Sequence, residues 1–206
     1  MKSRLFLIVG LVLFFAGISQ AQRTTSIGLR GGLNLSNVTG KNITDVKMRR
    51  ATNFGAFITH SVREHWGVTG EINYSGKGFI SKPQTGEKTT YPAEYLEVPV
   101  YGTFYFFGSD AKYRPKVFAG PSVAYLLSST GRMKYNRFDV GAVVGAGVNR
   151  EFGNDNWLYV DVRYTMGFTN IYKDGQEAVP AFGVSSTNAW NRVMSVNVGV
   201  SFPLGQ

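Results

Sequence analysis

Alternation between apolar and polar residues is the dominant pattern of this 206-residue chain from Thr24 onward. The pattern is clearest over residues 66–75, 158–169 and 194–202, where alternate positions are apolar and those between are polar or glycine. Because successive side chains of a β-strand point to opposite faces, a period of two predicts strands with one apolar face. Five further segments fit less cleanly: residues 26–35, 54–62, 95–107, 117–128 and 140–152. The chain is therefore predicted to be all-β, with eight strands.

The connections between these segments alternate in length. Tight turns are expected at residues 63–65 and 153–156, and a fairly short connection at 108–115. Longer connections are expected at residues 36–53, 82–94, 129–139 and 170–189. Short turns on one side and longer loops on the other are typical of transmembrane β-barrels. The pattern predicts an eight-stranded antiparallel up-and-down transmembrane β-barrel in the outer membrane of a Gram-negative bacterium, with both termini in the periplasm.

The amino terminus predicts export. Lys2 and Arg4 precede an apolar run over residues 5–18, and Ser19-Gln20-Ala21 places small residues before an expected cleavage site. A retained helical anchor is the alternative, but the run is shorter than the roughly 20 residues that a spanning helix needs. Residues 1–21 are therefore predicted to be a signal peptide, and residues 22–206 the barrel domain.

Composition restricts the chemistry. There is no cysteine, which excludes disulfides, thiolate metal sites and cysteine nucleophiles. The 25 glycines, 15 phenylalanines and 11 tyrosines suit a β-rich fold. The formal net charge of +9 would raise nucleic acid as a partner, but the expected export argues against it. Lipid phosphates are anions that an exported chain does meet.

The charges on the polar faces predict an inverted barrel, with a polar lumen and an apolar outside. Five charged residues lie at mid-strand positions of the polar faces: Arg30, Glu71, Glu97, Asp161 and Arg163. Buried charges must pair, and the interior of an eight-stranded barrel is just filled by side chains. These residues are therefore predicted to form a lumen charge cluster that acts as a structural plug, or alternatively as a gate.

Two further groups of residues are predicted to meet the membrane. An aromatic girdle at the strand ends is expected to comprise Trp66, Tyr74, Phe106, Trp157, Phe168, Trp190 and Phe202. Basic residues of the long loops are expected to contact lipopolysaccharide phosphates: Lys47, Arg49, Arg50, Lys82, Lys88, Arg132, Lys134 and Arg137.

Four short motifs resemble those of a known family. The segments are GGLNLS at 31–36, YLEVP at 95–99, AGP at 119–121 and DVRY at 161–164. They are similar to the outer-membrane β-barrel proteins of Bacteroidetes, the PorT-like or "porin family" barrels. The resemblance implies an outer-membrane location and an eight-stranded barrel, without an enzyme activity or a fixed substrate. One founding member of that family is associated with protein secretion and gliding machinery.

Two local features depart from a simple barrel. Barrel proteins often end on an aromatic residue that the insertion machinery reads, whereas four residues follow Phe202 here. Pro99 and Pro121 lie inside predicted strands, where each removes a ladder donor, and β-bulges are expected at both.

The functional expectation is a non-enzymatic structural or surface-loop interaction role with a plugged polar lumen. The chain has only two histidines, His60 and His65, both near one end of the predicted barrel. Neither suits a Ser-His-acid arrangement on the external side, and no residues have metal-ligand spacing. No cofactor or metal is expected. The expected partners are outer-membrane lipid, lipopolysaccharide and the barrel insertion machinery. A narrow porin-like channel for small solutes and a barrel component of a secretion apparatus remain as alternatives.

Overall fold

The computed structural model describes residues 25–40, 46–82, 88–130, 135–153, 156–172 and 188–204. The predicted signal peptide at residues 1–21 lies outside these residues, as do Arg132 and Lys134.

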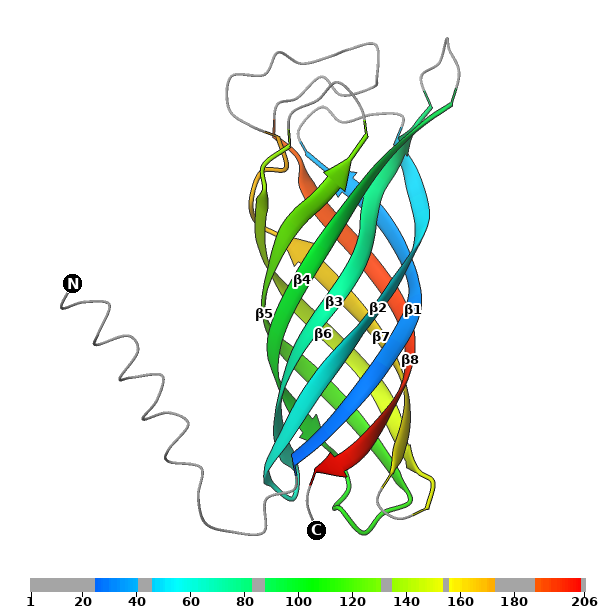
Figure 1. The fold of residues 1–206 in the computed structure, drawn as a ribbon, viewed down its shortest axis with the longest axis vertical. Coiled ribbons are helices and arrows are strands. Elements are labelled where there is room, and N and C mark those ends of the chain that lie inside the picture. The colour runs from blue at the N-terminus through cyan, green and yellow to red at the C-terminus, as the bar shows by residue number, and fades with distance from the viewer. Residues whose placement is uncertain are drawn as a thin grey trace, which may run out of the picture.

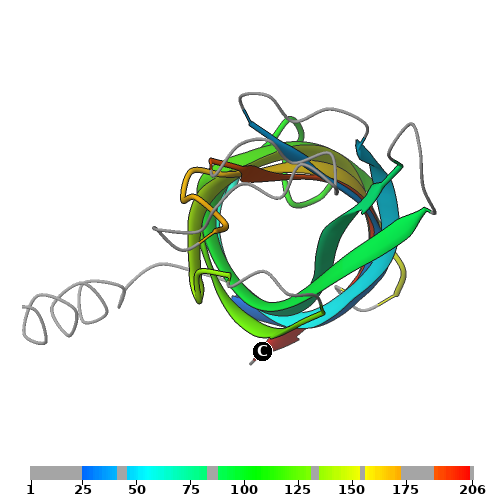
Figure 2. The ribbon, with the colours of Figure 1, turned by 90° about the horizontal axis from the view of Figure 1, so that it is seen from above.

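The chain forms a closed antiparallel barrel of eight strands, as the alternation predicted (Figures 1 and 2). Each strand pairs with the next along the sequence, and β1 pairs with β8 to close the ring. The strands are β1 (Thr25–Thr39), β2 (Val46–Arg63), β3 (Trp66–Ser81), β4 (Thr89–Tyr105), β5 (Tyr113–Ser129), β6 (Phe138–Glu151), β7 (Trp157–Gly167) and β8 (Trp190–Leu204).

The two ends of the barrel differ. The start of β1, the end of β8 and the connections β2–β3, β4–β5 and β6–β7 lie at one end, which we call the turn end (Figure 1). The connections β1–β2, β3–β4, β5–β6 and β7–β8 lie at the other, the loop end. At the turn end only residues 64–65 separate β2 from β3.

Several strands extend further toward the loop end than the sequence predicted. β2 begins at Val46 and β4 at Thr89, within segments that were expected to be loops. The prediction failed there because the inner face becomes aromatic, with Phe79 and Tyr91 buried, while Lys47 on the outer side is polar. The backbone ladder continues through this change, since strand pairing does not depend on which face is apolar.

The two prolines do not produce the expected bulges. The β4–β5 register pairs Pro99 with Ser122 and runs on without a shift, and the β5–β6 register likewise runs unshifted through Pro121. The missing donor costs a local ladder bond, but neighbouring pairs on either side hold the register. The shift between β4 and β5 lies instead beside Glu94, and β2–β3 carries two others.

The faces of the wall are inverted relative to a soluble barrel. Outward residues such as Leu29, Ile72 and Val160 are more than half exposed, whereas inward residues such as Glu71 and Asp161 are almost fully buried. An apolar outer band around a polar interior is the arrangement of membrane barrels. Over the described residues, no helix is long and apolar enough to cross a membrane.

Candidate functional site in the barrel lumen

The middle of the lumen holds an ion-pair network centred on Glu71, brought together from four strands. Arg30 and Arg163 each place a guanidinium nitrogen 3.0 Å from Glu71 Oε2, and Tyr101 donates a hydrogen bond to Oε1 at 2.5 Å. Arg163 also contacts Asp161 at 3.2 Å. All five side chains point inward because they occupy inward positions of the alternating strands. The two arginines and two carboxylates neutralise one another.

A second ion-pair group lies toward the loop end. Lys77 Nζ is 3.2 Å from Glu97 Oε2 and 3.9 Å from Asp139 Oδ2. Ser122 donates to Glu97 at 2.8 Å, and Asn191 donates to Asp139 at 2.8 Å. Lys77 is 2% exposed, so its charge depends on these two carboxylates rather than on water.

Almost no space remains between the two groups. A cavity lined by Arg30, Glu97 and Arg163 has a volume of about 10 Å³. This is about what a single water molecule requires. The middle of the lumen is therefore filled by side chains, as an eight-stranded barrel allows.

An aromatic cluster fills the lumen at the loop end. Phe79 and Tyr91 stack at 5.1 Å, and Tyr135 pairs with Tyr172 through an isolated β-bridge. Burial raises the pKa of the Tyr135 hydroxyl to about 12. The buried members of the cluster are Val38, Phe79, Tyr91, Tyr135, Ile171, Tyr172 and Ala189.

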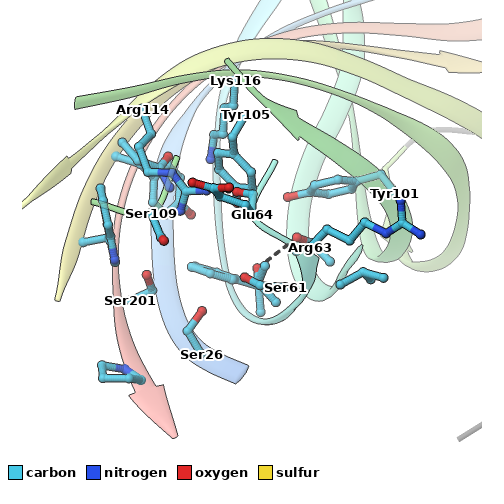
Figure 3. Close-up of a pocket in the computed structure, with 18 of the residues that line it drawn as sticks. Ser26, Ser61, Arg63, Glu64, Tyr101, Tyr105, Ser109, Arg114, Lys116 and Ser201 are labelled. Atoms are coloured by element: carbon cyan, nitrogen blue, oxygen red, sulfur yellow. Dashed lines mark hydrogen bonds between the residues drawn. The ribbon is translucent and has the colours of Figure 1, made fainter. Parts of the chain in front are cut away.

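The turn-end part of the lumen is open space. A cavity of about 740 Å³ extends from Tyr101, below the Glu71 network, to the turn residues Glu64 and Asp110 (Figure 3). Two inward cations of β5 line it, and each lies against an aromatic ring: the Arg114 guanidinium is 4.1 Å from the Tyr105 ring centroid, and Lys116 Nζ is 4.3 Å from that of Tyr159. We call this space the turn-end cavity.

All five residues of the predicted charge cluster face the lumen, but they fall into two groups. Arg30, Glu71, Asp161 and Arg163 form the central network, whereas Glu97 pairs with Lys77. Sequence analysis missed Lys77 because Gly76 and Gly78 occupy the neighbouring outward positions, where a strand of this barrel would normally carry apolar residues. Without them the alternation is not visible. Continuing the period of two from Glu71 would have placed it inward.

Asp139, Arg114 and Lys116 were also missed. Asp139 and Arg114 were placed in connecting segments, and Lys116 lies one residue before a predicted strand. In the structure β6 begins at Phe138 and β5 at Tyr113, so all three belong to strands. Arg114 and Lys116 lie four and two residues before the buried Phe118, so all three face the same side of the strand. This spacing is the signal that would have assigned the two cations to the inner face.

The predicted aromatic girdle is wrong for one residue. Trp157 lines the turn-end cavity, since it shares the inward parity of Tyr159, and its ring lies 5.4 Å from the Arg114 guanidinium. Trp66, Phe106 and Phe202 are exposed on the outside near the turn end, and Phe168 is exposed beyond the loop-end side of β7. Tyr74 is half-buried, and its ring stacks on that of the exposed Phe54 at 5.0 Å. Trp190 is also half-buried, and the next residue, Asn191, is buried in the lumen.

The basic residues of the loop end differ in their surroundings. Arg49, one of the residues predicted to contact lipopolysaccharide, is paired with Glu94 at 3.0 Å and donates to the Lys77 carbonyl. The remaining described members are exposed at this end: Lys47, Arg50, Lys82, Lys88 and Arg137.

The two histidines are engaged in local contacts. His60 Nδ1 lies 3.0 Å from the Thr25 hydroxyl, and the His65 ring lies 6.2 Å from that of Phe104. Within the described ranges neither ring contacts a carboxylate, and no group of three His, Cys, Asp or Glu residues could hold a metal ion.

The chain is similar to several solved structures. The structure superposes on OprG from Pseudomonas aeruginosa with a TM-score of 0.59 at 14% identity, covering 89% of this chain and 98% of OprG. The N-terminal β-barrel domain of OprF from the same organism gives a TM-score of 0.47 at 12% identity, covering 89% and 100%. Neisserial surface protein A gives 0.48 at 13%, covering 85% and 97%. No curated protein sequence matches the chain significantly.

Sequence comparison with protein families gives a definite assignment. The family model described as outer membrane protein beta-barrel domain matches residues 18–173, which is more than half of the chain. The closed eight-stranded wall with its apolar outer face is consistent with that match. The chain therefore belongs to the outer membrane protein beta-barrel domain family, and its location is the outer membrane.

Proposed function

We propose that this protein is a non-conducting structural barrel that acts through its wall and its loop-end surface. The observation that carries the proposal is the filled middle of the lumen, where the Glu71 and Lys77 groups leave a cavity of about 10 Å³. The aromatic cluster at the loop end adds a second filled level. A solute or a hydrated ion would have to break both to pass, so the charge cluster acts as a plug.

Conductance across a planar lipid bilayer tests this proposal. We expect no unitary current steps from the purified wild-type barrel, with a porin added to the same bilayer as the positive control. Current steps that change in size on Arg163→Gln or Glu97→Gln would instead identify the cluster as a gate. In that case the narrow channel for small solutes would be the correct function.

The orientation is part of the same proposal. We place the turn end in the periplasm and the loop end outside the cell, because short periplasmic turns and longer external loops are typical of such barrels. The exposed cations Lys47, Arg50 and Lys82 would then face the outer leaflet, where lipopolysaccharide phosphates are the anions that Lys and Arg bind.

Binding to lipopolysaccharide tests the role of these cations. Lys47→Ser with Arg50→Ser should weaken binding to lipopolysaccharide aggregates by a few-fold, and more at low salt because exposed charges are screened. Arg150→Ser with Lys112→Ser removes the same charge from exposed positions at the turn end and serves as the matched control. Equal loss in the two pairs would contradict the proposed orientation.

The motif resemblance supports a narrower placement among the PorT-like barrels of Bacteroidetes, and with it the second candidate function, a component of a secretion apparatus. That function requires partner proteins. Purification of the barrel from its native membrane without any co-purifying protein would count against it.

A further inference from the structure

The turn-end cavity contains two buried cations that form no ion pair with any described carboxylate. Arg114 and Lys116 are 8% and 9% exposed, and within the described part of the chain neither has a carboxylate oxygen within 4.0 Å. Arg114 donates to the backbone carbonyls of Glu64 and Phe107 at 2.7 and 3.3 Å. A buried cation without a counter-charge is costly, so an anion is the natural complement of this site.

The same barrel shows what a purely structural arrangement looks like. In the middle of the lumen Arg30, Lys77 and Arg163 each contact at least one carboxylate. In the turn-end cavity aromatic rings take the place of the carboxylates. The ring centroid lies 4.1 Å from the Arg114 guanidinium and 4.3 Å from Lys116 Nζ. Ring contacts orient a cation without neutralising it, so both side chains keep their charge available to a ligand.

The walls of the cavity suit an organic anion rather than a bare ion. Tyr105, Trp157 and Tyr159 give it flat apolar surfaces, and hydroxyls of Ser26, Ser61 and Ser201 point toward the same space (Figure 3). Its volume of about 740 Å³ lies within the range of small-molecule sites, roughly 300–1,000 Å³. The lining carboxylates, Glu64 and Asp110, lie in exposed turns at the mouth. Their charges act on Arg114 at longer range, but neither forms an ion pair with Arg114 or Lys116.

We propose that the turn-end cavity binds a small organic anion. Its phosphate or carboxylate group contacts Arg114 and Lys116, and its flat apolar part lies against the aromatic wall. The ligand enters from the turn end, because the filled middle of the lumen closes the other side. Charge-assisted hydrogen bonds to two cations give the affinity, and the rings select a ligand larger than an inorganic ion.

Fluorescence of Trp157 provides a direct test. The chain has three tryptophans, so the full-length protein with Trp66→Phe and Trp190→Phe reports only from the cavity wall. Trp157 is excited at a wavelength that phenyl phosphate does not absorb. Added phenyl phosphate should then change the Trp157 emission saturably, whereas phenol at the same concentrations should not. Inorganic phosphate should compete, with weaker affinity because it lacks the ring.

Substitution of the buried Lys116 distinguishes a specific binding site from non-specific binding. In the reporter background, Lys116→Met should weaken phenyl phosphate binding by about tenfold or more, as loss of a charge-assisted hydrogen bond predicts. Lys88→Met, at the loop end, is the matched control and should leave binding unchanged. A gel shift between boiled and unboiled samples confirms that each variant is folded. Should Lys116→Met fail to fold, Arg114→Gln carries the same test.

Two competitors distinguish the sources of the anionic group. Displacement of phenyl phosphate by both glycerol phosphate and short-chain phosphatidylglycerol identifies a free anion site, and displacement by the lipid alone identifies a site for headgroups. Either result supports the proposal. A linear response to phenyl phosphate, an equal response to phenol, or binding that Lys116→Met leaves unchanged would overturn it.

Discussion

The middle of the lumen and its turn end are built from the same eight strands, yet they solve the problem of buried charge differently. Around Glu71 and Lys77, each cation contacts a carboxylate and the remaining space is about 10 Å³. Below Tyr101, Arg114 and Lys116 lie against aromatic rings beside about 740 Å³ of open space. The number of strands fixes the width of a barrel, but the side chains decide whether a given level is closed or can hold a ligand.

Lys77 and Lys116 make the contrast measurable with one residue type. Both are buried inside the barrel, at 2% and 9% exposure, and both lie near a tyrosine ring. Lys77 has two carboxylate oxygens within 4.0 Å, whereas Lys116 has none within that distance among the described residues. The same substitution at the two positions should therefore have opposite consequences for stability.

The largest effect is expected at the centre of the closed level. Glu71→Gln removes the charge that both Arg30 and Arg163 contact. Among the described residues it leaves Arg30 without an ion pair and Arg163 with Asp161 alone. Breaking a buried ion pair from one side costs about 3–5 kcal/mol. Urea unfolding of the barrel in phospholipid vesicles, followed by tryptophan fluorescence, measures this loss.

Asp110→Asn is the control for that experiment, because Asp110 is exposed in a turn and forms no ion pair with the described residues. A loss for Glu71→Gln no larger than that of the control would mean that the central network contributes little to stability.

An intermediate effect is expected for Lys77→Met. The variant leaves Glu97 and Asp139 without their cation, and we expect a loss of about 3 kcal/mol in the free energy of unfolding. Combining it with Glu97→Gln should cost less than the sum of the two single changes, since the pair would be removed together. Strict additivity in this double-mutant cycle would show that Lys77 and Glu97 are not energetically coupled.

The smallest effect is expected for Lys116→Met. No ion pair is broken, and an unpaired buried charge is replaced by an apolar side chain of similar length. The free energy of unfolding should change by no more than about 1 kcal/mol, and an increase is the favoured direction. The same urea titration measures it beside Lys77→Met. Similar losses at the two lysines would remove the distinction between the closed level and the turn-end cavity.

The sequence pattern predicted the positions of some lumen residues incorrectly, and the reason can be identified for each. Lys77 was missed because glycines at 76 and 78 replaced the outward apolar residues that mark a strand. Trp157 was placed on the outside because an aromatic at a strand end suggests a girdle, while its parity with Tyr159 puts it in the cavity. Arg114 was assigned to the connection predicted at residues 108–115, although β5 begins at Tyr113.

The sequence by itself determined the eight antiparallel strands, the inverted faces and the inward position of the five predicted charges. A period of two is a local property of the backbone, so neighbouring residues suffice to reveal it. Only the tertiary structure decided which charges meet: Glu71 pairs with Arg30 of β1 and Arg163 of β7, while Glu97 pairs with Lys77 of β3. Those contacts, and the cavity beneath them, depend on strand register and on closure of β1 against β8. Register and closure join residues far apart in the chain, so local alternation predicts which way a side chain faces but not which side chain it meets across the lumen.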